Sequence, residues 1–137
     1  MKIDGSCLCG HLSFEADIDP GMVAICHCTD CQSCSGAYRG AVIVDVKDFR
    51  LLSGTPSVYV KTAARGGRRA LSFCPGCGTS LHGANVEDPK TYSLRLGMVR
   101  QRDQLPPKMQ LWCSSAQAWV FDLNEIPRFD TQPDLKL

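Results

Sequence analysis

The sequence predicts an all-β fold, and two observations carry this prediction. Short runs of alternating or β-branched residues recur along most of the chain, separated by turn-forming residues such as Asp19-Pro20-Gly21 and Ser53-Gly54-Thr55-Pro56. Signals for helices are few. With 137 residues, of which 44% are hydrophobic, we expect one domain over residues 1–137 with a core of its own.

The first half of the chain supplies four of the expected strands. Residues 11–16 alternate between apolar and polar side chains, which indicates a half-buried strand. Residues 41–46 form an apolar, β-branched run. We expect residues 49–52 to pair near this run across a short turn, and residues 57–61 to form a further alternating strand.

The second half supplies four more expected strands and is equally rich in turns. The one helix signal lies in the first half, where residues 29–36 predict a turn or two of helix with Thr29 as the cap. The later strands are expected at residues 69–73, 91–97, 109–112 and 118–123.

The composition argues against two classes of partner. The chain has 15 basic and 14 acidic residues, so no basic excess is available to hold the phosphates of a nucleic acid. It has no run of about eighteen apolar residues to span a membrane, and its start lacks the apolar core of a secretory signal. We therefore expect a cytoplasmic protein with neither nucleic-acid nor membrane partners; the sequence does not predict the oligomeric state.

Cysteine is the most informative residue type in this chain. In a reducing compartment, clustered cysteines are more often metal ligands than disulfides. A zinc ion needs several sulfurs within about 2.3 Å of one point, whereas packing does not require such close spacing along the chain. Seven of the nine cysteines fall into three clusters: Cys7-x-Cys9, Cys26-x-Cys28-x2-Cys31 and Cys74-x2-Cys77.

The third cluster is typical of a metal knuckle. Gly78 follows Cys77 directly and allows the unusual backbone angles of a tight turn, which frees backbone N–H groups to bond the sulfurs. The same Cys-x2-Cys spacing also occurs in redox dithiols that open a helix, and in turns with no metal, so these remain the alternatives.

The first cluster needs further ligands from elsewhere in the chain to bind zinc. Two residues apart on an extended strand, Cys7 and Cys9 point to the same side and can face one ion, but two ligands bind zinc poorly. We infer that Cys74 and Cys77 complete a closed site of four sulfurs that stabilises the fold.

The middle cluster points to chemistry. Cys26, Cys28 and Cys31 could hold a zinc ion and leave its fourth position for water or for a substrate sulfur, which would then be a thiolate at neutral pH. The alternative is a second structural site, closed by Cys34, His27 or His82.

Other chemically versatile residues have ordinary interpretations. His27 lies between two expected ligands and should point to the opposite face, and we interpret it, like His11 and His82, as a surface or core histidine. Cys113 is expected to be a small buried side chain.

Arginines surround a Gly-Gly turn that is expected to be a solvated loop. Arg65, Arg68 and Arg69 flank Gly66-Gly67. A forked guanidinium at this place could instead hold a substrate carboxylate.

The chain resembles the GFA family, the glutathione-dependent formaldehyde-activating enzymes, which include the centromere protein V domain. The resemblance covers roughly residues 4–130 and includes Trp119 and Ile126-Pro127-Arg-Phe129 near its end. It implies a zinc-containing β-tent fold of small coiled antiparallel sheets. The motifs that carry it, in order, are Gly5-Ser-Cys-Leu-Cys-Gly10, Cys26-His-Cys-Thr-Asp-Cys31 and Phe73-Cys-Pro-Gly-Cys-Gly-Thr79.

The resemblance also implies roles for the cysteines. Members of the family pair the first and last clusters around a structural zinc, which assigns that role to Cys7, Cys9, Cys74 and Cys77. The middle cluster then holds the second, catalytic zinc through Cys26, Cys28 and Cys31. The implied activity is that of a carbon–sulfur lyase, which joins glutathione, as co-substrate, and formaldehyde into S-(hydroxymethyl)glutathione.

Two positions depart from the family pattern. Cys34 stands where we expect no cysteine, and a family Pro-x2-His occurs here as Pro107-Lys-Met-Gln110. Two other functions therefore stay open: a non-catalytic, zinc-stabilised module that binds protein partners, and a redox or metal-storage protein that uses Cys34 and Cys113.

Overall fold

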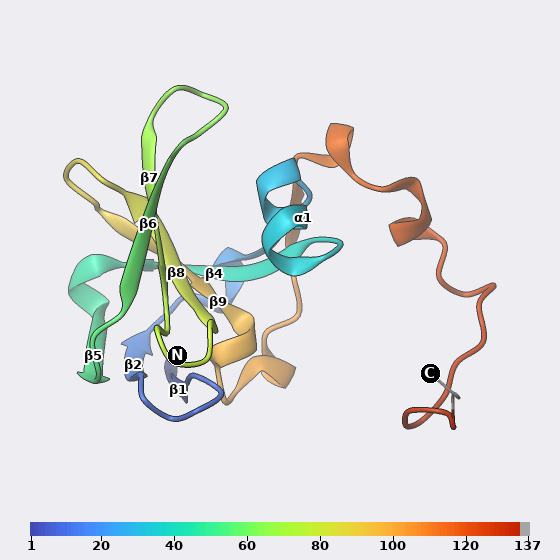
Figure 1. Cartoon of the computed structure of the whole chain (residues 1–137), viewed down its shortest axis with the longest axis horizontal. Coiled ribbons are helices and arrows are strands. Elements are labelled where there is room, and N and C mark those ends of the chain that lie inside the picture. Colours follow the sequence, from blue (N-terminus) through green and yellow to red (C-terminus); the bar gives the residue numbers. More distant parts are fainter. Residues whose placement is uncertain (135–137) are drawn as a thin grey trace.

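Residues 1–134 are described by a computed structural model of the chain. Their strands form one sheet of three strands and one sheet of seven, joined by 3-10 turns and one short α-helix (Figure 1). The all-β prediction is therefore confirmed. No helix in this part of the chain is both long enough and apolar enough to cross a membrane.

The small sheet contains β1 (Lys2–Ser6), β2 (Ser13–Asp17) and β5 (Phe49–Ser53), with β2 in the middle and both pairs antiparallel. The prediction that residues 49–52 pair near residues 41–46 is wrong. A 3-10 turn at Val46–Asp48 carries the chain from one sheet to the other, where the ring of Phe49 stacks on Phe14 at 5.6 Å.

The large sheet has the strand order β10-β3-β4-β9-β8-β7-β6. Its neighbours are antiparallel except for β10, which runs parallel to β3. The strands are β3 (Val23–Cys26), β4 (Arg39–Asp45), β6 (Ser57–Thr62), β7 (Arg68–Phe73), β8 (Ser80–Asn85), β9 (Thr91–Arg95) and β10 (Met109–Leu111).

The core lies between the two sheets. Phe14 of the small sheet and Val42 and Leu94 of the large sheet are each 0% exposed. Val42 and Leu94 are register partners, so both side chains leave the large sheet on the same face. Burying a side chain of this size contributes about 1.5–3 kcal/mol, and the apolar positions of the alternating strands therefore hold the sheets together.

The helix α1 (Thr29–Ser35) follows β3 directly, as residues 29–36 predict. Its N-cap is Cys28 rather than the predicted Thr29, because the Cys28 sulfur accepts the backbone N–H of Cys31 at 3.4 Å. Gly36, with φ 95°, ends the helix in a conformation that glycine adopts without strain.

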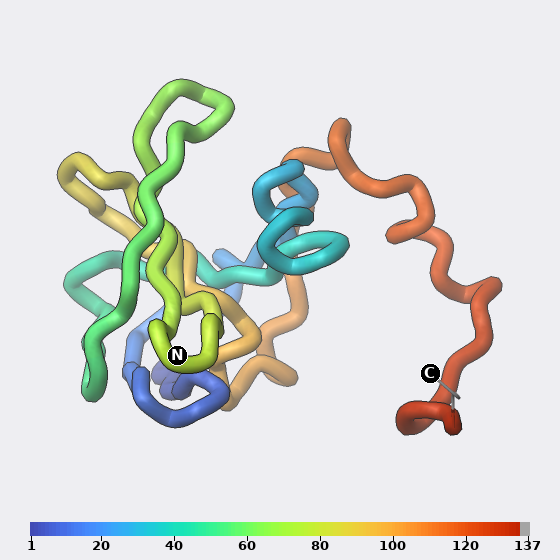
Figure 2. Tube along the Cα trace, viewed as in Figure 1, coloured from blue at the N-terminus to red at the C-terminus, as the bar shows by residue number. Residues whose placement is uncertain are grey.

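The expected strand at residues 118–123 is wrong, and Ala118–Phe121 forms a 3-10 turn instead. Residues 112–134 pass α1 and then run away from both sheets, and no described strand pairs with them (Figure 2). Apolar side chains in this segment are left exposed, among them Trp119, Phe121, Ile126 and Phe129.

Candidate metal centres and pocket

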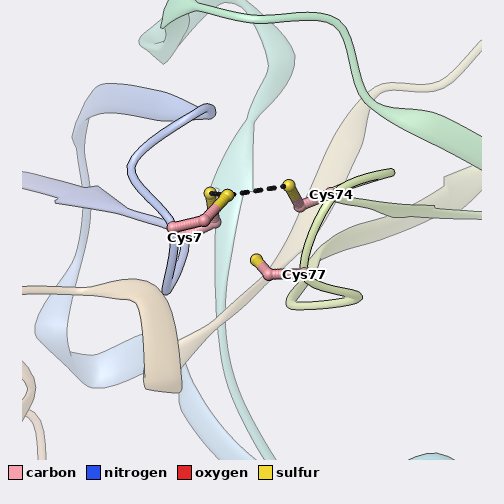
Figure 3. Close-up of side chains that lie close together, drawn as sticks. Cys7, Cys74 and Cys77 are labelled. Carbon is pink, nitrogen blue, oxygen red and sulfur yellow. Dashed lines mark hydrogen bonds between the residues drawn. The ribbon is translucent and has the colours of Figure 1, made fainter.

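The first and third cysteine clusters meet, as the sequence predicts. Cys7 and Cys9 lie between β1 and β2, and Cys74 and Cys77 lie between β7 and β8. Figure 3 shows Cys7, Cys74 and Cys77 close together. Their four sulfurs all lie within 4.8 Å of one another, and Cys9 Sγ is 3.6 Å from both Cys7 Sγ and Cys74 Sγ. Sulfurs bound tetrahedrally at 2.3 Å from zinc are about 3.8 Å apart. The four cysteines therefore fit one tetrahedral ion.

Local backbone structure shapes both halves of this cluster. Gly10 and Gly78, which follow Cys9 and Cys77, have φ values of 79° and 73°. The pKa of Cys77 falls to about 5, chiefly because the Thr79 hydroxyl, 3.1 Å from its sulfur, bonds to it. The segment after Cys77 leads into β8 rather than a helix, which supports the knuckle over the redox pair.

The second cluster lies where β3 meets α1. Cys26 ends the strand, Cys28 caps the helix, and Cys31 lies in its first turn. The three sulfurs lie within 4.8 Å of one another, with Cys28 Sγ 3.1 Å from Cys31 Sγ. A hydrogen bond from Cys31 lowers the pKa of Cys26 to about 5, and the same bond together with burial raises that of Cys31. These sulfurs too could hold a metal ion.

The candidate fourth ligands do not join this cluster. Cys34 is exposed and lies outside the group of sulfurs within 4.8 Å of one another. His27 is 0% exposed and faces elsewhere, with its Nε2 donating to Gln110 Oε1 at 2.9 Å. His82 stacks on the ring of Tyr92 at 4.0 Å. Within residues 1–134 the second cluster therefore offers three sulfurs to a metal ion.

The histidines behave as core or surface side chains. Burial, and then the charge of Arg95, lower the pKa of His82 to about 4, so this side chain is neutral at pH 7. His11 is exposed, and its Nε2 accepts the backbone N–H of Thr55 at 3.4 Å.

A cavity of about 950 Å³ opens over the second cluster. Its lining includes all three cysteines of that cluster, but none of the four cysteines of the other cluster. Four cationic side chains and one carboxylate, Asp30, also line it. A separate cavity of about 630 Å³ beside the small sheet contains no cysteine. The cationic residues are Arg39, Lys61, Arg65 and Arg69.

Two segments form the rim of this cavity. Arg65, at the turn between β6 and β7, lies 5.7 Å from the ring centre of Trp112. Trp112 has a left-handed backbone (φ 57°) and precedes a 3-10 turn at Cys113–Ser115. Cys113 is exposed and lines the cavity, so the expectation that it is buried is wrong; the turn places it at the surface.

Two features near the second cluster are not evident from the sequence. Arg39 lines the cavity, yet it precedes an apolar run and carries no motif. Gln110 contacts His27 across 83 positions of sequence. The only local signal for Arg39 is its position two residues before Ala41, which places the two side chains on the same face of β4.

Comparisons with known proteins identify the family. A family model described as "Glutathione-dependent formaldehyde-activating enzyme" matches residues 2–115, so Trp119 and residues 126–129 lie beyond the match. No curated protein matches the chain significantly. A crystal structure of a Rhodobacter sphaeroides protein from structural genomics shares 20% identity, with a TM-score of 0.59 over 78% of this chain and 98% of that chain. At this identity the likeness shows a shared fold. The chain therefore belongs to the glutathione-dependent formaldehyde-activating enzyme family.

Proposed function

We propose that this protein is a zinc-dependent carbon–sulfur lyase that forms and cleaves the adduct of glutathione with formaldehyde or a related small aldehyde. The observation that carries the proposal is the difference between the two clusters. One has four sulfurs, none of which lines the cavity of about 950 Å³, whereas the other has three sulfurs that all belong to residues in the lining of that cavity.

The two clusters would have different tasks. Cys7, Cys9, Cys74 and Cys77 would hold a structural zinc that ties the two sheets together. Cys26, Cys28 and Cys31 would hold a second zinc. With three protein ligands, such an ion would offer a fourth position that keeps a substrate sulfur deprotonated at neutral pH.

The charge of the cavity favours an anionic thiol. Arg39, Lys61, Arg65 and Arg69 line it against one carboxylate, Asp30, which pairs with Lys61. Glutathione carries two carboxylates beside its thiol and therefore suits this surface. The guanidinium group of arginine binds a carboxylate through two parallel hydrogen bonds, so these side chains would orient the thiol toward the three cysteines.

The reaction itself needs no oxidant. The sulfur of glutathione donates an electron pair to the aldehyde carbon and forms the carbon–sulfur bond, while the carbonyl π pair moves to oxygen. That oxygen takes up the proton that the thiol released, which gives a hydroxymethyl thioether. Cleavage runs through the same steps in reverse. The task of this chain is to position the two reactants within the cavity.

Exchange NMR would test the proposed activity, because thiols also add to formaldehyde without a catalyst. Catalytic amounts of zinc-loaded protein should speed the interconversion of free glutathione and its formaldehyde adduct. Cys28→Ser should return the rate to the uncatalysed value, whereas Cys34→Ser, which changes a thiol outside both clusters, should keep the acceleration. An exchange rate in wild type equal to that without protein would refute the proposal.

A second candidate is a non-catalytic, zinc-stabilised module with protein partners. The exposed side chains of Trp119, Phe121, Ile126 and Phe129 favour it, because apolar groups gathered on one segment are typical of interaction surfaces. In that case Cys28→Ser would disturb stability or partner binding, with no turnover to lose.

A further inference from the structure

One face of the large sheet collects the cationic side chains near the second cluster. Cys26 on β3 and Arg39 on β4 are register partners, and directly opposite residues of antiparallel strands point to the same face. Arg39 and Ala41, two residues apart, also share that face. Ala41 is in turn the partner of Arg95 on β9. Cys26, Arg39 and Arg95 therefore leave the sheet on the same side.

The same face continues across β8 to β7. Ser93 on β9, two residues before Arg95, pairs with Gly83 on β8, and Gly83 in turn pairs with Leu71 on β7. Arg69 lies two residues before Leu71 and therefore shares this face. A Cβ at Gly83 would lie only 3.2 Å from Arg95 Nη2 and 3.5 Å from Arg69 Nη2. Two guanidinium groups thus converge over the glycine, in the space where any other residue would place its side chain. We call Arg39, Arg69 and Arg95 the guanidinium cluster.

The guanidinium cluster has no carboxylate partner among residues 1–134. Each ion pair formed among residues 1–134 uses other cations, as in Lys61 with Asp30 and Arg68 with Glu87. Arg95 is 6% exposed, and its pKa falls to about 9 because of burial and then the charge of Arg39. Burying a cation without an ion-pair partner is unfavourable, so the charge of Arg95 favours a bound anion.

Two hydrogen-bond donors in the cluster also lack partners, although Arg95 Nη1 donates to the backbone oxygen and the hydroxyl of Ser93. The Nε atoms of Arg39 and Arg95 are buried, and neither has a hydrogen-bond acceptor within the described residues. Arg69 Nη1 donates only to the neutral Asn85 Oδ1, at 2.8 Å. Arg39 and Arg69 line the cavity itself. The cluster therefore presents both charge and free donors beside the three cysteines.

We propose that the guanidinium cluster is a carboxylate-binding subsite that makes the cavity select thiols carrying a carboxylate over neutral thiols. The inference rests on the proposed function, since it concerns the thiol substrate of that site. Three thiolates with one zinc ion carry a formal charge of −1, which offsets only one of the three guanidinium charges. A carboxylate, held by forked hydrogen bonds, would offset another.

Three small probes separate the carboxylate from the thiol. They are 3-mercaptopropionate, which has both groups, 2-mercaptoethanol, which has only the thiol, and propionate, which has only the carboxylate. Titration calorimetry on the zinc-loaded full chain gives the affinities. NMR of the Nε–H groups of Arg39 and Arg95 reports anion binding directly, whether or not a thiol is present.

Matched variants locate the subsite. Wild type should bind 3-mercaptopropionate at least ~10-fold more tightly than 2-mercaptoethanol, because hydrogen bonds to charged groups are strong. This ratio should fall close to one in Arg39→Gln and in Arg69→Gln. Arg68→Gln is the control, because Arg68 is adjacent in sequence, exposed and paired with Glu87.

The outcomes separate this inference from the proposed function. A ratio near one in wild type, or a ratio unchanged in both cavity variants, would overturn the carboxylate subsite. If neither thiol binds any form of the protein but propionate still shifts the Arg39 and Arg95 Nε–H signals, the proposed function fails and the anion subsite stands. Arg69→Lys provides a second test at that position, because it keeps the positive charge but loses the paired donors of the guanidinium group. It should weaken the preference for 3-mercaptopropionate over 2-mercaptoethanol only in part.

Discussion

Cys9 Sγ lies 3.6 Å from Cys74 Sγ, although 65 positions separate the two residues in sequence. Cys9 belongs to the loop between β1 and β2 of the small sheet, and Cys74 to the loop between β7 and β8 of the large sheet. Figure 3 shows Cys7, from the same loop as Cys9, close to Cys74 and Cys77. An ion bound here would close a long loop of chain and fix one sheet against the other. In this protein the metal would therefore contribute to folding as well as to chemistry.

Removing one ligand of this cluster should destabilise the whole domain. Cys9→Ser should lower the metal content from two ions to one, and the free energy of unfolding by at least about 3 kcal/mol, because a structural zinc adds its binding energy to folding. Metal analysis and urea unfolding measure both quantities. Cys34→Ser is the control and should keep both ions. Equal stability of Cys9→Ser and wild type would contradict the structural role.

Loss of a ligand from the second cluster should abolish thiol binding but change the stability of the domain little. Cys28→Ser should lose one ion and the ability to bind thiols, but keep most of its stability, because the four-sulfur cluster remains intact. Metal content, calorimetry with glutathione and thermal unfolding test this together. Two retained ions in Cys28→Ser, with normal thiol binding, would show that this cluster is not the thiol site.

The contact between Gln110 and His27 should be structural. Gln110→Leu would leave His27 Nε2 buried without a partner, which costs about 1–3 kcal/mol of unfolding free energy. Urea unfolding measures this loss. Gln117→Leu is a suitable control, since its amide bonds to Gln32 at an exposed site. Equal stability of Gln110→Leu and the control would argue against a structural role.

His82 should make the fold sensitive to acid. Its pKa is lowered from 6.5 to about 4, so the unfolded chain takes up this proton below pH 6.5 while the folded chain does not until about pH 4. The stabilising contribution is present above pH 6.5 and is lost as the pH falls toward 4, by about 2 kcal/mol between pH 7 and 5.

A matched variant separates this titration from metal loss in acid. His82→Phe retains a ring against Tyr92 and removes the titrating group, so its unfolding free energy should fall less between pH 7 and 5 than that of wild type. Urea unfolding at the two pH values gives the difference. An identical loss in both proteins would assign the acid sensitivity to other groups.

The grouping of the cysteines is predictable because sequence spacings that suit a metal ion constrain the chain locally. The Cys-x-Cys and Cys-x2-Cys spacings, each followed by a glycine, predict the pairing of Cys7 and Cys9 with Cys74 and Cys77, and the structure brings these four together. Most strands with clear alternation were also predicted, because burying one face of a sheet imposes that pattern.

The remaining features depend on which strands become neighbours. β1, β3 and β8 were not predicted: β3 has four residues, and β8 contains Gly83 where side chains from β7 and β9 fill the space. The partner of β5 was wrong because contact with Phe14, not proximity in sequence, decides it. The meeting of Cys26 with Arg39 likewise follows only from register.

Calorimetric titration of glutathione into the protein loaded with two zinc ions tests the central claim most directly. Wild type should bind glutathione at millimolar or lower concentration, and Cys28→Ser, with the four-sulfur cluster still loaded, should not bind. Absence of binding heat in wild type at millimolar glutathione, or equal binding by Cys28→Ser, would contradict a thiol site at the three-cysteine cluster.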